Sequence, residues 1–128
     1  MNVRKLIVLL LLIFASISAE AIEKIKLTGP QLVERIGGYE VIAGTSNQGK
    51  YNYMVVVYSN GTRELYWNDG IKSGTDKGTH RIEGDQICVT WQNSFEGKEQ
   101  CFDVFKVGES KYESLSNDEF TFTYYKIR

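Results

Sequence analysis

The spacing of turn signals after Gly38 constrains the fold of this chain more than any other feature of its sequence. Glycine, asparagine and aspartate favour tight turns because they tolerate backbone conformations that other residues avoid. Such turns are expected at Asn60-Gly61, Asp69-Gly70, Gly84-Asp85, the loop Asn93 to Gly97, Gly108-Glu109 and Asn117-Asp118. The segments between them leave little room for crossover helices, which parallel strands would need. The sequence therefore predicts an antiparallel meander, with strands at 39–44, 50–59, 62–68, 71–74, 78–83, 86–92, 98–107, 111–115 and 119–126.

The predicted fold class is all-β: an antiparallel up-and-down β-barrel of about eight strands, lipocalin-like in architecture. Closing into a barrel removes exposed sheet edges, and small barrels hold either side chains or one small ligand. One short N-terminal α-helix is expected to pack outside the barrel. Its predicted residues are Thr28 as the cap, Pro30 in the first turn, Leu32, Val33 and Ile36 on one face, and Gly37 and Gly38 at its end.

The two cysteines are expected to form a Cys88–Cys101 disulfide, because thiols oxidise outside the reducing cytosol. A two-residue turn at Gly84-Asp85 pairs Ile82 with Ile87, Arg81 with Cys88, and His80 with Val89. A cross-strand bridge then pairs Ile87 with Phe102 and Val89 with Gln100. These registers put Ile82, Ile87, Val89, Trp91, Phe102 and Val104 on one apolar face. The disulfide falls on the opposite face, with Arg81, Gln86, Thr90, Glu99 and Asp103.

A two-residue turn at Asn60-Gly61 pairs Tyr58 with Arg63, Val56 with Leu65, and Met54 with Trp67. The reverse side of this hairpin is also apolar, since it includes Tyr53, Val55, Val57 and Tyr66. A strand that is apolar on both sides needs a cover. We expect the N-terminal helix to supply it; the alternative is a partner surface, such as a dimer contact.

The first residues predict export. A basic start at Arg4 and Lys5, an apolar run from Leu6 to Phe14 and small residues up to Ala19 are typical of a secretory signal peptide. We expect cleavage after Ala19 or Ala21, which gives a signal peptide at 1–19 and a single β-barrel domain at 20–128. The apolar run is shorter than the roughly 20 residues of a membrane-spanning helix. The predicted location is periplasmic or secreted, without stable membrane insertion.

Charge gives no reason to expect binding to nucleic acid. The chain has Lys+Arg 15 and Asp+Glu 16, and without Arg4 and Lys5 its net charge is about −3, which offers no attraction for nucleic acid or an anionic membrane surface.

The sequence has no recognisable catalytic motif. It lacks Gly-x-Ser-x-Gly, a glycine-rich phosphate loop and His-Glu-x-x-His, and His80 is its only histidine. The segment 68–78 has Asp69 and Asp76 but not the ligand spacing of a calcium-binding loop. We therefore expect no catalytic residue, no metal site and no cofactor, although paired carboxylates of a small hydrolase have no sequence signature.

His80 is polar at a position where the pattern asks for an apolar residue, so it needs a hydrogen-bond partner or a ligand. One interpretation is a satisfied histidine at a barrel mouth. The other joins it with aromatic residues as the lining of a small-molecule pocket, whose candidate residues are Tyr58, Trp67, His80, Trp91, Tyr112 and Tyr124.

The segments LTGPQLVERIGG, Asp69-Gly70, GTHRIEGDQICVTW and EQCFDVFKVG resemble a family of small exported bacterial proteins known only as a domain of unknown function. The resemblance spans residues 27–108 and rests on short structural motifs. This chain has His80 where the family usually has tryptophan, and the family implies no established activity. In architecture the chain is also similar to lipocalin-like barrels and to small periplasmic inhibitors of lysozyme.

The sequence thus predicts a non-catalytic exported protein that holds a small apolar or amphipathic ligand in a barrel mouth, as a monomer or weak homodimer. The alternative is docking to, or inhibition of, another exported protein through loops such as 68–78 and 93–97. A large internal cavity would favour the first function, and a filled interior with a protruding ordered loop would favour the second.

Overall fold

The computed structural model describes residues 23–46, 49–117 and 121–128. The helices are α2 (Gly29–Ile36) and the 3-10 turn η1 (Ser94–Gly97). The strands are β1 (Ile25–Lys26), β2 (Glu40–Ser46), β3 (Asn52–Val57), β4 (Thr62–Asn68), β5 (Ser73–Glu83), β6 (Gln86–Trp91), β7 (Gln100–Lys106), β8 (Lys111–Ser116) and β9 (Thr121–Lys126). The predicted signal peptide and part of the turn at Asn117-Asp118 lie outside these residues.

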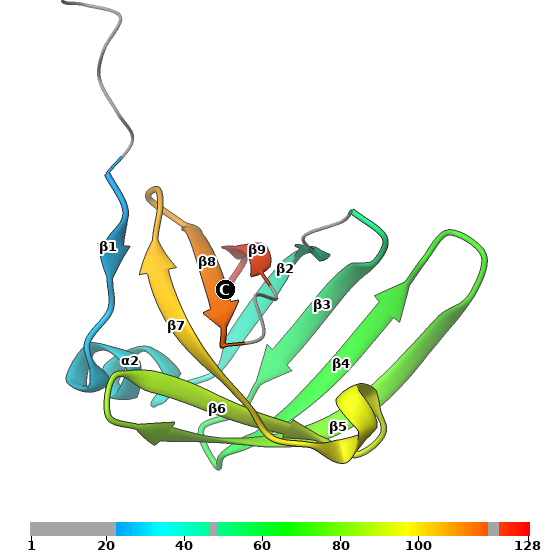
Figure 1. The fold of residues 1–128 in the computed structure, drawn as a ribbon, viewed down its shortest axis with the longest axis horizontal. Helices are drawn as coiled ribbons and strands as arrows, with labels where there is room; N and C mark the ends of the chain where they lie inside the picture. The colour runs from blue at the N-terminus through cyan, green and yellow to red at the C-terminus, as the bar shows by residue number, and fades with distance from the viewer. Residues whose placement is uncertain (1–22, 47–48, 118–120) are drawn as a thin grey trace, which may run out of the picture.

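Strands β2 to β9 form a closed antiparallel barrel (Figure 1). Each pairs with the next strand along the chain, and the pairing of β9 with β2 completes the ring. The short strand β1 lies outside it, on the edge of β7. The predicted fold class, an up-and-down barrel with one short helix, is confirmed.

One long strand, β5, replaces two predicted strands and the loop between them. Residues 73–77 continue the pairing with β4, for example Leu65 opposite Asp76. The turn before β5 is short, because the Asp69 carboxylate accepts hydrogen bonds from the backbone N–H groups of Ile71 and Lys72. The prediction of a loop over 68–78 is therefore wrong.

The predicted register of β5, β6 and β7 is confirmed. His80 lies opposite Val89, Arg81 opposite Cys88, and Cys88 opposite Cys101, to which it is bonded by a disulfide. Gly84 and Asp85 form a two-residue turn, with Gly84 at a φ of 57° that suits glycine.

The predicted register of β3 and β4 is wrong by one residue. Val57, not Tyr58, lies opposite Arg63, because the connection has three residues and is closed by a hydrogen bond from Tyr58 N–H to Thr62 O at 3.0 Å. A slip of one residue moves every side chain of a strand to the other face. Tyr53, Val55 and Val57 therefore face the interior, and the side chains predicted inside, Met54, Val56 and Tyr58, face outward.

Helix α2 lies at one end of the barrel, beside the turn that joins β5 to β6 (Figure 1). The Gln31 side chain accepts the Thr28 backbone N–H at 2.9 Å as half of a capping box. Leu32 and Ile36 are buried in the core, whereas Val33, predicted on the same face, is exposed. The helix thus covers the barrel end and not the outside of β3 and β4, where Met54 stays exposed; the predicted cover is absent there.

The ladder between β6 and β7 has only three paired positions, Ile87–Phe102, Cys88–Cys101 and Val89–Gln100, whereas every other ladder in the ring has five or more. Beyond it, β1 pairs with β7 at Lys106 and Phe105. The disulfide therefore joins the middle pair of the shortest ladder within the ring.

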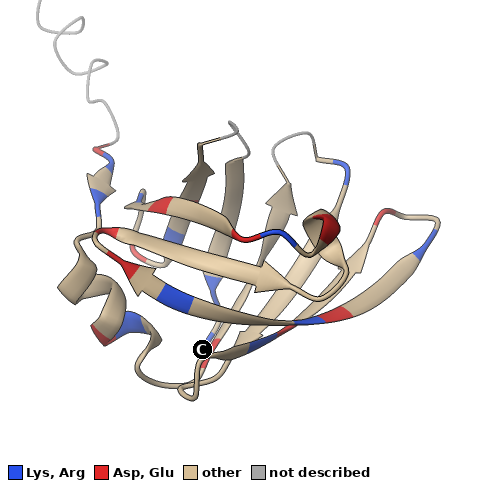
Figure 2. Cartoon of the chain, turned by 60° about the horizontal axis from the view of Figure 1, so that its bottom comes forward, with Lys and Arg blue, Asp and Glu red and all other residues tan. Residues whose placement is uncertain are grey.

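Residues of both charge signs are interspersed along the strands (Figure 2). Three ion pairs join separate strands or the residues just before them: Lys26 of β1 with Asp103 of β7, Arg81 of β5 with Glu99 before β7, and Lys24 before β1 with Glu113 of β8. Exposed pairs of this kind contribute little to stability. Among the described residues, no helix is long and apolar enough to cross a membrane.

Candidate ligand-binding cavity

The barrel interior is hollow, with a cavity of about 500 Å³. This volume lies within the usual range of small-molecule sites, roughly 300–1,000 Å³. Most of its wall is apolar and comes from the inward positions of the strands, including Ile42, Tyr53, Val55, Leu65, Ile87, Val89, Phe102, Val104 and Phe122. Alternation along each strand brings these side chains to one face.

Two glycines on the inner face of β5 make room for the two tryptophans. A side chain at Gly74 would lie 2.7 Å from the ring of Trp67, and one at Gly78 would lie 2.6 Å from the ring of Trp91. Both indoles line the cavity. Because Gly74 and Gly78 have no β-carbon, the two indoles can lie close to β5, and the cavity is wider on this side.

The end of the cavity next to α2 is polar. Arg35 of α2 donates from Nε and Nη2 to Glu40 Oε1 at 3.0 and 2.8 Å, and both side chains are at most 9% exposed. Its guanidinium also lies 3.7 Å from the ring centre of Tyr112. Burial alone would lower the pKa of Arg35, but the contacts with Tyr124 and Glu40 outweigh burial and raise it. Arg35 is therefore a fully engaged cation that holds the helix against the barrel.

Tyr124 links this ion pair to β8. Its hydroxyl accepts from Arg35 Nη1 at 3.4 Å and lies 3.0 Å from the Ser114 hydroxyl, with which it shares a buried hydrogen bond. Tyr112 stacks on its ring at a centroid distance of 5.9 Å.

A second buried arginine, Arg63, also lines the cavity. Its Nε donates to His80 Nδ1 at 3.0 Å, which is the one side-chain hydrogen bond that Arg63 makes within the described part of the chain. Its residue exposure is 9%, and no carboxylate of the described residues forms an ion pair with it. Burial lowers the pKa of Arg63 to about 10, so the guanidinium stays charged at neutral pH. Burial and the charge of Arg63 lower the pKa of His80 to about 4, so the imidazole is neutral.

The opposite end of the cavity is formed partly by η1. The Asp76 carboxylate accepts the backbone N–H groups of Ser94 and Asn93 at 2.7 and 3.1 Å. Burial pushes the pKa of Asp76 upward, but these hydrogen bonds outweigh it and lower the pKa. They fix η1 so that Phe95 lies edge-on to Phe122, at 6.3 Å between ring centres.

The six predicted pocket residues lie in three different places. Trp67, Trp91 and Tyr124 line the cavity. Tyr112 and His80 are outside its lining but contact the lining residues Arg35 and Arg63. Tyr58 is on the outside, against Tyr39 at 5.9 Å between ring centres, as a result of the shifted register.

Four of the described charged residues line the cavity, and sequence reasoning missed three of them, Arg35, Glu40 and Arg63; it considered the fourth, Asp76, only as a rejected calcium ligand. A signal was present for two of them. Arg63 alternates with Leu65 and Trp67 on one face of β4, and Glu40 alternates with Ile42 on β2. Charged side chains at inward positions are expected only where they are paired or functional. No comparable pattern distinguishes Arg35 on its short helix.

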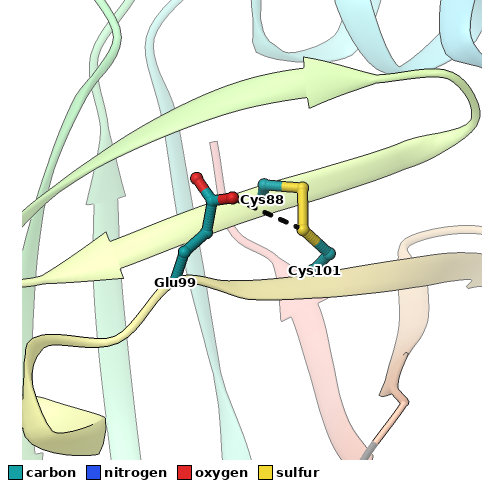
Figure 3. Close-up of side chains that lie close together, drawn as sticks. All are labelled: Cys88, Glu99 and Cys101. Atoms are coloured by element: carbon teal, nitrogen blue, oxygen red, sulfur yellow. Dashed lines mark hydrogen bonds between the residues drawn. A yellow bond between two sulfur atoms is a disulfide. The ribbon is translucent and has the colours of Figure 1, made fainter.

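A cluster on the outer wall has the residue types of a metal site but not their chemistry. Cys88, Glu99 and Cys101 lie together (Figure 3), with Cys101 Sγ 3.9 Å from Glu99 Oε1. Both sulfurs are in the disulfide, so neither is a thiolate that could bind a metal ion.

Comparison of the chain with protein-family models, with curated protein sequences and with solved structures returned no match. Membership of the uncharacterised exported family therefore stays a prediction.

Proposed function

We propose that this protein binds a small apolar or amphipathic molecule inside its barrel, without catalysing a reaction on it. The observation that supports this is the cavity of about 500 Å³, whose wall is mostly apolar and has a few polar groups at each end. A protein interior is normally packed with few voids larger than a water molecule. A hollow of this size is typical of a ligand site.

The contacts of the titratable groups support binding over hydrolysis. Glu40 is held by Arg35, and Asp76 by the backbone of η1, so each carboxylate already has a structural partner. The neighbour of His80 at hydrogen-bond distance is Arg63 and not a carboxylate. A general acid or base needs a protonation site within reach of the substrate, and these contacts occupy the groups in question.

Docking to another protein has weaker support. Most of the segment 68–78, proposed from the sequence as a docking loop, forms the ends of β4 and β5. The loop 93–97 and exposed apolar side chains on the outside of the barrel, such as Tyr39, Met54 and Tyr66, are candidates for a partner surface.

Export remains part of the proposal. The Cys88–Cys101 disulfide supports an oxidising compartment, in which a cystine persists.

The test is native mass spectrometry of the full chain, produced in a bacterial host that exports it, followed by denaturation to release bound molecules. A stoichiometric small molecule is expected with the native protein. A matched pair of variants locates it: Val89→Trp adds bulk to the cavity wall, and Thr90→Trp places the same side chain on the outer face of the same strand. Loss of the molecule from the first variant alone supports the proposal. Equal retention by both variants contradicts it.

A further inference from the structure

Arg63 is the group in the cavity that the proposed function leaves unexplained. It is buried and charged, and among the described residues its side chain is hydrogen-bonded through Nε alone. A buried charge without a counter-charge costs stability, and buried cations in proteins are normally paired. Its neighbour Arg35, by contrast, has Glu40 as its partner.

The polar end of the cavity has an excess of one positive charge. It contains two guanidinium groups, Arg35 and Arg63, and one carboxylate, Glu40. His80 does not alter this balance, because its Nδ1 accepts the Arg63 hydrogen bond and is therefore unprotonated. One negative charge would make this end neutral.

The geometry of Arg63 also favours an anion with two oxygens. His80 holds Nε, which leaves the two terminal nitrogens of the guanidinium for another acceptor. No side-chain nitrogen or oxygen of the described residues is both fully buried and unpaired, so these terminal nitrogens keep access to open space. A guanidinium edge binds a carboxylate through two parallel hydrogen bonds.

The rest of the cavity wall indicates the chemistry of the part of the ligand that does not contact Arg63. Between this end and η1, most of the lining is formed by side chains such as Val55, Leu65, Val89 and Phe102, which offer no hydrogen bonds. An inorganic anion alone would leave this surface without a partner. An apolar chain would fill it and gain the free energy of burial.

We infer that the ligand is a monocarboxylate with an apolar tail, with its carboxylate on Arg63 and its tail along the apolar wall. This inference rests on the proposed function and names the ligand class for that same cavity. Glu40 is near enough to raise the pKa of Arg63, but no described carboxylate forms an ion pair with it, and binding would supply that direct contact.

The test uses dodecanoate and dodecanol, which share a chain length and differ in charge, with calorimetry and the fluorescence of Trp67 and Trp91 as readouts. Dodecanoate is expected to bind at least about tenfold more tightly than dodecanol, since hydrogen bonds to charged groups are the stronger kind. Arg63→Met should abolish this preference by weakening dodecanoate, and Arg63→Lys should retain only part of it. Arg81→Met, which removes an exposed arginine from the outer wall, is the control and should keep the full preference.

The outcomes separate the two proposals. If neither compound binds the native chain and no ligand copurifies, cavity binding itself fails. If both bind equally well, or if Arg63→Met keeps the preference for dodecanoate, the cavity binds ligands but the assignment to a carboxylate at Arg63 is overturned. If Arg63→Met does not fold, Arg63→Lys decides the question, because an unchanged preference in it would show that the two-nitrogen geometry is not used.

Discussion

Arg63 and His80 form a hydrogen bond in which the Arg63 Nε donates to the His80 Nδ1 at 3.0 Å. The pairing joins a cation to a base, so it persists only while the imidazole is neutral. The pKa of His80, lowered from 6.5 to about 4 by burial and by Arg63, reflects this. The histidine that the sequence singled out thus acts on its neighbour, by holding one edge of the guanidinium.

The stability of the protein should fall as the pH drops from about 6.5 to about 4. In this window the unfolded chain binds a proton at His80 that the folded chain does not, which favours unfolding. Above about pH 6.5, His80 is neutral in both the folded and the unfolded chain, so the free energy of unfolding no longer changes with pH through this group. Asp76, Asp69 and Glu99 also have lowered pKa values. Because the ordinary pKa of a carboxyl group is near 4, these three groups change the stability mainly at lower pH than His80 does. Urea unfolding across this range measures the slope. His80→Gln, whose amide oxygen can still accept from Arg63, should flatten it; an unchanged slope would assign it to another group.

Breaking the buried Arg35–Glu40 pair should destabilise the fold strongly. Glu40→Gln leaves the Arg35 cation buried without its counter-charge, which typically costs about 3–5 kcal/mol. The matched control is Glu99→Gln on the outer wall, where the partner Arg81 is exposed and the loss should be much smaller. Chemical denaturation of both variants tests the contrast. Similar losses would mean that Arg35 finds another partner in the variant.

Gly78→Ala should displace the indole of Trp91, a β6 residue whose ring packs against Gly78 of β5. The new methyl group would meet the indole at 2.6 Å, and overpacking of this kind costs about 1–3 kcal/mol. A change in tryptophan emission and a lower unfolding midpoint are expected together. Gly38→Ala is the control, because nothing lies within 4 Å of a side chain at that position. Unchanged emission in Gly78→Ala would show that the strand moves in place of the indole.

Removing the disulfide with Cys88→Ala and Cys101→Ala should lower the free energy of unfolding by about 2–4 kcal/mol while leaving the far-UV circular dichroism spectrum unchanged. Within the ring, the bridge joins the ladder with the fewest paired positions, so the loss of stability should be concentrated there. Hydrogen exchange should accelerate first at the amides of β6 and β7. Uniform acceleration over the barrel would show that the bridge acts on the unfolded chain alone.

The sequence predicted registers where two independent constraints agreed. At β5, β6 and β7, only one alignment satisfies both constraints. The turn at Gly84-Asp85 has two residues, and Cys88 must lie opposite Cys101 to form the disulfide. At β3 and β4, Asn60-Gly61 suits both two-residue and three-residue connections, and both sides of β3 are apolar, so periodicity could not choose. The resulting error of one residue placed Tyr58 in the pocket and left Tyr53 outside it.

The grouping of charged residues at the polar end of the cavity could not be predicted from the sequence, for a different reason. Arg35, Glu40, Arg63 and Tyr124 come from α2, β2, β4 and β9, and they meet only because the ring closes and the helix covers its end. The aromatic content of the chain indicated an apolar lining, but which side chains share one end depends on the stagger of the strands.

The short ladder beside the disulfide also bears on self-association. A closed ring offers no unpaired strand edge, whereas a ring that opens at one ladder exposes two at once. Here the opening would free β6 and β7, whose side chains Ile87, Val89 and Val104 belong to the core. Strands with such apolar residues and free backbone groups pair readily with other copies. We therefore expect the cystine to limit aggregation: its reduction should leave most molecules folded but raise the small population of open rings that can form intermolecular sheets.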